Sequence, residues 1–406
     1  MKDTAIAAHL RKRGIAFIGI SRIVRSVAAG MINVAFPYYI LVDLHYGPSV
    51  IGLIYVAATL ATALMSFLFG ITTDTWGKRW TLILTSALLP ISALFVLVRG
   101  NLWMIVAAAM LGGYSATGSL AGGGVGGAVQ PVQNAVLTDL VPKEKRTSYF
   151  SFFTFLAGAA GAGGALLVKM FSTTDVFLVA AAIAAAGIPF LWFVEVVERK
   201  GALRVLKTKA TIGKFSATGM LNGLSQGLVV PFLIPFFLIV YHIPKAQMAE
   251  YTFLSGIIGS CALLAAPLLE RWLGFLKSTL VTRGIGTVLF VLFPFVRYLP
   301  FAVFVYLFGP ALRVAAIPIQ QAELTRRVDD DELGRALGVN QVARLVASSA
   351  GTGLSGYLLD AALFEIPFVA YGVVMAANLY LYVRFFGAGK DEKGRAPSSH
   401  SPQVGL

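Results

Sequence analysis

Charged residues are scarce in this sequence: they make up 13% of its 406 residues, about half of the roughly 25% that is usual in soluble domains. Hydrophobic residues make up 57%, and the mean hydropathy is +0.78. The single cysteine, Cys261, lies in an apolar run and can form no internal disulfide. Together these values exclude a soluble globular protein and argue against a disordered or a disulfide-stabilised chain.

Long apolar runs take the place of the missing charge. A membrane-crossing helix needs about 20 mostly apolar residues, and charged or polar residues separate the runs. The sequence therefore predicts an all-α integral membrane protein with twelve transmembrane helices: 15–41, 49–71, 80–98, 102–138, 147–169, 175–195, 214–241, 248–269, 278–297, 300–325, 336–359 and 364–386.

Basic residues are distributed unequally between the two sets of loops. The set that includes the N-terminus holds most Lys and Arg, whereas the opposite set holds only Arg99, Lys169, Lys245 and Arg297. Cytoplasmic loops carry the excess of Lys and Arg, so we expect a multi-pass protein of the cell membrane with both termini cytoplasmic. Topology then explains most of the net charge of +14, and no nucleic-acid partner is needed.

The longest basic polar segment, 196–213, divides the predicted spans six and six. We expect an N-terminal six-helix bundle at 1–195, a cytoplasmic linker at 196–213, a C-terminal bundle at 214–387 and a disordered tail at 388–406. The halves resemble each other, since Pro131-Val-Gln-Asn-Ala-Val-Leu-Thr aligns with Pro318-Ile-Gln-Gln-Ala-Glu-Leu-Thr. Doubled halves are common in secondary transporters, which bind their substrate between the repeats.

The loop after the second span reads Gly70-Ile-Thr-Thr-Asp74-Thr-Trp-Gly77-Lys78-Arg79. It resembles the signature between helices two and three of the major facilitator superfamily, and the resemblance extends over about residues 10–390. It implies that Gly70, Asp74, Gly77, Lys78 and Arg79 form a conformational latch and that the two halves work by alternating access. The alternative is a positively charged turn that only fixes topology.

Two departures from the family pattern weaken a proton-driven drug exporter without excluding it. Tyr114 stands where antiporters often carry an arginine in the fourth helix, and the Gly158-Ala-Ala-Gly161 segment of the fifth helix lacks the usual proline. The glycine-rich segment 121–127 suggests either an unwound stretch that lines the pathway or close packing of a neighbouring helix.

Five arginines remain inside the predicted spans, where a charge usually faces a cavity or a partner. We expect Arg283 to reach the cytoplasmic surface and Arg22 to lie at the membrane interface. Arg313 lies near mid-span, too deep to reach the surface easily, and Arg25 is the better candidate for a substrate contact in the first span. For Arg344 a structural and a functional role stay open.

In the family, helices one, four, seven and ten line the central cavity, and the sequence has polar residues on all four. The amides of Gln133, Asn134, Gln320 and Gln321 serve either the cavity or contacts between helices. The candidate substrate-cavity residues are Arg25, Asn33, Tyr114, Asn222, Gln226 and Arg313.

No carboxylate and no histidine falls near the middle of a predicted span, so the coupling ion, H⁺ or Na⁺, has no obvious carrier. Asp43 and Glu323 are the nearest candidates. No cluster of His, Cys and Asp suggests a metal site, and no motif suggests an enzyme or a cofactor.

The sequence therefore predicts a monomeric carrier of a small polar or anionic organic solute in a lipid bilayer, either secondary active or facilitative. One alternative is a proton-driven exporter of amphiphilic drugs or metabolites. Another is a membrane receptor or sensor built on a transporter fold.

Overall fold

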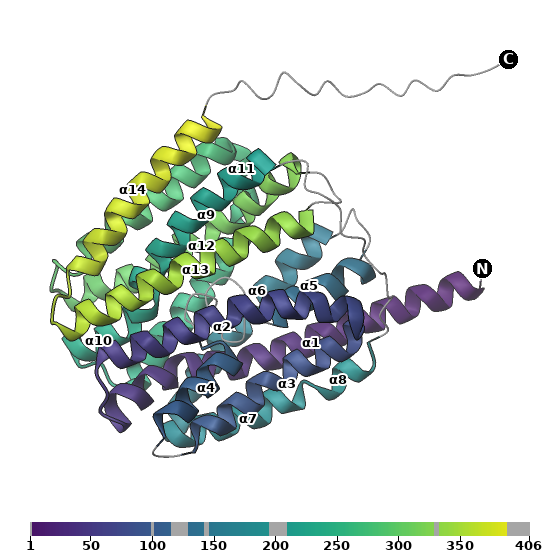
Figure 1. Cartoon of the computed structure of the whole chain (residues 1–406), viewed down its shortest axis with the longest axis horizontal. Helices are drawn as coiled ribbons and strands as arrows, with labels where there is room; N and C mark the ends of the chain where they lie inside the picture. Colours follow the sequence, from purple (N-terminus) through teal and green to yellow (C-terminus); the bar gives the residue numbers. More distant parts are fainter. Residues whose placement is uncertain are drawn as a thin grey trace.

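The computed structural model describes residues 2–98, 101–114, 129–141, 146–194, 209–328 and 333–387, and these segments are helical with short turns and no strand. The N-terminal group of helices runs from α1 to α8 and the C-terminal group from α9 to α14, and the two lie side by side (Figure 1). The bounds in the N-terminal group are α1 Lys2–Tyr38, η1 Tyr39–Asp43, α2 Pro48–Thr75, α3 Lys78–Val96, α4 Leu102–Gly112, α5 Val129–Leu140, α6 Arg146–Leu167, η3 Val168–Met170, α7 Thr173–Ala186 and α8 Pro189–Trp192.

The C-terminal group begins inside the predicted linker 196–213, because α9 starts at Lys209. The rest of that linker and the predicted tail lie almost entirely outside the described residues. The bounds are α9 Lys209–Val229, η4 Val230–Phe232, α10 Leu233–Tyr241, α11 Lys245–Leu292, α12 Leu299–Arg327, α13 Leu333–Asp360 and α14 Ile366–Phe386.

Within the described segments, nine helical stretches are long and apolar enough to cross a membrane. The prediction of an all-helical membrane protein is therefore confirmed, whereas the number twelve stays a prediction. The predicted eighth and ninth spans form one element, α11, which is 48 residues long and breaks at Gly274, where φ is 74° and ψ is 169°. Because glycine alone adopts such angles readily, α11 consists of two helices that meet at this residue.

Two other predicted spans are interrupted. The fourth, 102–138, does not form one helix, because α4 ends at Gly112 and Gly113 adopts left-handed angles (φ 60°, ψ 47°). The hypothesis on 121–127 concerns residues outside the described part of the chain. The sixth span, 175–195, divides into α7 and α8 at Gly187.

Equivalent turns in the two groups support the internal repeat. His45 and His242 both have positive φ, 56° and 53°, immediately before a helix that begins three residues later. Gly77 and Gly274 also share positive φ, 89° and 74°. Each pair is separated by the same distance in sequence, so the two groups repeat one backbone pattern.

We define the terminal end of the molecule as the end where α1 begins and α14 finishes, and the far end as the opposite one. Contacts between the two groups concentrate towards the far end. The Tyr38 hydroxyl donates to the carbonyl oxygen of Ile243 (2.7 Å), and Ser49 donates to Asp360 (2.8 Å). A Cβ on Gly52 would lie 2.8 Å from the Cα of Gly356, so the backbones of α2 and α13 nearly touch.

Glycines also bring helices together within each group. A Cβ on Gly227 would overlap the carbonyl oxygen of Ser348, and one on Gly223 would overlap that of Arg344. The hydroxyls of Thr352 and Ser355 use this closeness, because they donate to backbone oxygens of α9 at 3.3 and 2.6 Å. Small residues of this kind let membrane helices pack closely where the hydrophobic effect contributes little.

We predict that Gly227→Ala destabilises the protein by about 1–3 kcal/mol, because the added methyl forces α9 and α13 apart. Gly213→Ala on the same helix is the control, since a Cβ there meets nothing within 4 Å and alanine favours a helix. Thermal unfolding in detergent measures both. Equal melting temperatures for the two variants would contradict the packing described here.

Candidate functional site

The predicted latch lies at the terminal end, between α2 and α3. Gly77 caps α3 with angles that suit glycine (φ 89°, ψ 148°). The Lys78 ammonium forms an ion pair with Asp139 at the end of α5, at 2.5 Å, and both side chains are largely buried. Arg79 donates to the carbonyl oxygen of Trp192 and lies over its ring. This turn therefore ties α3 to α5 and α8.

Two other predicted latch residues, Gly70 and Asp74, belong to the backbone of α2, and their side chains are outside the description. The latch function stays a prediction. The sequence analysis did not identify Asp139 as the partner of Lys78.

The C-terminal group has ion pairs at the equivalent place. Arg326 contacts Glu270 at 2.9 Å, and Arg327 contacts Glu323 at 2.5 Å. In the C-terminal pair the acidic Glu270 precedes the turn at Gly274, and the basic Arg326 lies at the end of α12. In the N-terminal pair the basic Lys78 follows the turn at Gly77, and the acidic Asp139 lies at the end of α5. Glu323 is thus engaged in ion pairs, which makes it a poor carrier for a coupling ion.

Arg22 and Arg25 of α1 are buried among the helices of the N-terminal group. Arg22 is 3% exposed and donates to Asn134 of α5 at 3.4 Å, so it faces a neighbouring helix, and its place at the membrane interface stays a prediction. Its one-turn neighbour Arg25 is 6% exposed. Asn134 accordingly serves a contact between helices.

Arg283 does not reach the cytoplasmic surface, and that prediction is wrong. Its side chain is 2% exposed, donates to Asn378 of α14 at 3.3 Å and lies over the ring of Tyr382 at 5.4 Å. Asn378 in turn donates to the carbonyl oxygen of Thr218 on α9, at 2.7 Å. The guanidinium is held because α14 supplies both an amide and an aromatic face.

Arg313 lies near the middle of α12, as predicted, and is partly exposed. It lies beside the hydroxyl of the buried Tyr371 on α14. Its Nη1 is buried beside that hydroxyl, and no carboxylate of the described residues forms an ion pair with it. The charge of Arg313 therefore lacks a counter-ion within the described part of the chain.

Arg344, on α13, completes a group of three. It donates to Gln341 at 2.7 Å, remains partly exposed, and lies within electrostatic range of both Arg283 and Arg313. The C-terminal group thus brings together three arginines from three separate stretches of sequence. The spacing of these residues along the chain gave no sign of this cluster.

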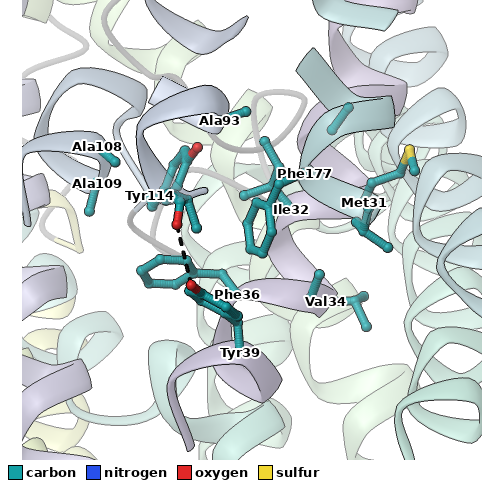
Figure 2. Packing of buried hydrophobic residues seen from close by; sticks show 14 of the residues in the cluster. Met31, Ile32, Val34, Phe36, Tyr39, Ala93, Ala108, Ala109, Tyr114 and Phe177 are labelled. Carbon is teal, nitrogen blue, oxygen red and sulfur yellow. Dashed lines mark hydrogen bonds between the residues drawn. The ribbon is translucent and has the colours of Figure 1, made fainter. Parts of the chain in front are cut away.

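Tyr114 lies in the packed interior of the N-terminal group. Figure 2 shows it close to Phe36 of α1, near Ala108 and Ala109 of α4. The Phe36 and Tyr114 rings meet edge to face at 5.1 Å, and the Tyr114 hydroxyl is 2.9 Å from that of Ser92. These contacts are structural, and a role of Tyr114 in a cavity stays a prediction.

The remaining candidates lie on the helices predicted for them. Asn33 is half-buried on α1, while Asn222 and Gln226 are buried one turn apart on α9. Gln133 is buried on α5. Their contact with a substrate stays a prediction.

A surface pocket lies at the far end, where the two groups meet. Its volume is about 280 Å³, and Asp43, His242 and Lys245 are among the residues that line it. The Lys245 ammonium donates to the carbonyl oxygen of Phe171 at 2.9 Å, which links the start of α11 to the residue that follows η3. Asp43, the other candidate ion carrier, is exposed on this surface.

Comparison with known proteins identifies one family and a set of similar folds. The sequence model of the Major Facilitator Superfamily matches residues 18–322. No curated protein is similar in sequence.

Several solved structures share the fold at low sequence identity. The human organic anion transporter MFSD10 (TETRAN) matches with a TM-score of 0.69 and 14% identity, over 92% of this chain and 99% of that one. The nucleoside transporter NupG matches with a TM-score of 0.70 and 13% identity, over 92% and 99%. An inward-facing, unoccupied bacterial homolog of the human lysosomal transporter Spinster matches with a TM-score of 0.69 and 12% identity, over 92% and 96%.

We predict that Lys78→Met and Asp139→Asn each destabilise the terminal end by about 1.5–3 kcal/mol, the usual value of a hydrogen bond to a charged group. The exchanged pair, Lys78→Asp with Asp139→Lys, should recover most of this loss. Thermal unfolding of the purified variants provides the measurement.

Lys169→Met is the control, because its ion pair with Glu250 is exposed and should contribute no more than about 1 kcal/mol. An exchanged pair as unstable as the single variants would show that the Lys78–Asp139 interaction does not hold this end together.

Proposed function

Because the chain belongs to the Major Facilitator Superfamily, we propose that it carries a small anionic or polar organic solute across the membrane by alternating access. The observation that carries the anionic preference is Arg313, which is partly exposed near the middle of α12 and forms no ion pair with a carboxylate of the described residues. A carboxylate or phosphate matches the fork of a guanidinium with two parallel hydrogen bonds.

The position of Arg313 supports a role in transport rather than in membrane anchoring. It lies 14 residues from the terminal end of α12, or about 21 Å along a helix that rises 1.5 Å per residue. A charge at this depth costs at least roughly 2.5–3.5 kcal/mol on insertion scales, so it usually faces a cavity or a partner. A solute that enters between the two groups would supply that partner.

Alternating access needs two rigid bodies and a closed end. We propose that the bodies are the six-helix halves 1–195 and 214–387, with twelve crossings in total and both termini cytoplasmic. The far end would then face outwards. Its contacts between groups, among them Tyr38 with Ile243 and Ser49 with Asp360, support a state that is closed to the outside and accessible from the cytoplasm.

The described carboxylates offer little for proton coupling, because Glu323 is ion-paired and Asp43 lies on an exposed surface. This favours an anion carrier over a proton-driven exporter of amphiphilic compounds. One structure with the same fold belongs to an organic anion transporter. We further propose that the protein is a monomer of the cell membrane, with the Gly70–Arg79 segment as its latch.

The test is uptake by proteoliposomes that contain the purified protein, with a panel of labelled anions, cations and lipophilic drugs and with or without a pH gradient. We predict that Arg313→Gln reduces uptake of the best anionic substrate roughly 10- to 100-fold, which corresponds to the loss of about 1.5–3 kcal/mol from a charged hydrogen bond.

Arg297→Gln is the matched control, because that side chain is 75% exposed at the far end, and its uptake should equal that of the wild type. Uptake confined to lipophilic cations would exclude an anion carrier, and unchanged uptake of the anion in Arg313→Gln would exclude Arg313 as its contact.

A further inference from the structure

We infer that Arg283, Arg313 and Arg344 together form a binding site for the doubly negative group of a solute, such as a phosphate ester or a dicarboxylate. This inference rests on the proposed function and narrows its substrate class from anions in general to dianions. The site belongs to the C-terminal group alone.

The first argument is the depth of the three residues. Arg283 lies 9 residues beyond the kink at Gly274, Arg344 lies 11 residues from the start of α13, and Arg313 lies 14 residues from the end of α12. At 1.5 Å per residue these positions are about 14, 17 and 21 Å from the terminal end. The three guanidiniums therefore occupy a narrow range of depths inside the membrane.

The second argument is charge. Each arginine lies within electrostatic range of the other two, and none forms an ion pair with a carboxylate of the described residues. The hydrogen-bond acceptors close to them are neutral: Asn378 for Arg283 and Gln341 for Arg344. Three like charges at low dielectric repel one another strongly, so this arrangement favours an anion among them.

The third argument is access, which differs among the three. Arg313 and Arg344 are partly exposed. Arg283 is 2% exposed and is fixed by Asn378 and Tyr382. Arg313 and Arg344 thus contact the ligand, while Arg283 adds a fixed positive charge.

The number of charges selects a dianion over a monoanion. One carboxylate can pair with a single guanidinium fork, which would leave the second accessible arginine facing the fixed charge of Arg283. A dianion pairs with Arg313 and Arg344 at once. It also reduces the repulsion that both experience from Arg283.

Binding is measured directly on the purified full-length protein in detergent. Inorganic phosphate and succinate should each be tested by thermal unfolding against lactate and chloride at equal ionic strength. A ligand that binds the folded state raises the melting temperature by mass action. We expect phosphate or succinate to raise it by several degrees and lactate to leave it nearly unchanged. A larger effect of phosphate indicates a phosphate ester, and a larger effect of succinate indicates a dicarboxylate.

The variants Arg313→Gln and Arg344→Gln should weaken dianion binding at least about tenfold, which corresponds to about 1.4 kcal/mol, whereas Arg344→Lys should weaken it less. Arg297→Gln is again the control and should bind as the wild type does. Without ligand, Arg344→Gln should melt no lower than the wild type, because the change removes repulsion.

A second measurement needs no variant. Phenylglyoxal, which modifies accessible arginines, should label Arg313 and Arg344 in the wild-type protein, and the effective dianion should protect both. Mass spectrometry of the labelled peptides gives the extent of modification at each residue. Arg283 should remain unlabelled with and without the anion, because it is buried.

Equal stabilisation by lactate and succinate, or unchanged dianion binding in Arg344→Gln, would overturn the inference. If phosphate and succinate fail to bind while uptake of an anionic solute still depends on Arg313, the dianion site is wrong and the proposed function stands. If no anionic or polar solute is taken up, the proposed function itself fails, and if uptake of an anion does not depend on Arg313, the assignment of the site fails.

Discussion

Positive charge buried in the membrane is the constraint on which the interpretation of this protein depends. Five arginines lie inside helices that are otherwise apolar, and within the described residues four of them, Arg22, Arg283, Arg313 and Arg344, form no ion pair with a carboxylate. The protein satisfies part of their hydrogen-bonding capacity with neutral groups, as Asn378 does for Arg283 and Asn134 for Arg22. Neutral acceptors relieve the desolvation of a guanidinium, but they do not neutralise its charge. A substrate anion can do both.

The sequence determines the helical architecture well because hydropathy reports the length of a span directly. It determines the interruptions less well. The break of α11 at Gly274 falls in the gap between the predicted spans 248–269 and 278–297, where charged residues interrupt the apolar run. The end of α4 at Gly112 falls inside a predicted span, because a run of apolar letters does not show the left-handed backbone angles of Gly113. The repeat was detectable in sequence, and the positive φ values at His45 and His242 show the same repeat in the backbone.

The arginines show where sequence reasoning has its limit. Distance from the end of a span suggested that Arg283 would extend to the surface, but the direction of a side chain depends on which helix faces it. Here α14 offers Asn378 and Tyr382 on the inner side, and the arginine turns inwards. The contacts of Tyr114 with Ser92 and Phe36 likewise come from helices that its position in the fourth span did not indicate. The depth of a residue within a span follows from the local sequence, whereas the direction of its side chain depends on residues that are distant in sequence.

The ion pairs at the terminal end explain how such a site could be exposed to one side at a time. Lys78 with Asp139 joins α3 to α5, and Glu270 with Arg326 joins α11 to α12. Each pair lies within one group: Lys78 follows the turn at Gly77, and Glu270 precedes the turn at Gly274. At this end, ion pairs therefore connect helices of the same group, whereas the contacts between the two groups concentrate towards the far end. Breaking the far-end contacts, such as Ser49 with Asp360, leaves two intact bodies, because no helix has to unfold. The arginine cluster lies wholly in one of those bodies, so its geometry would persist while the other body moves across it.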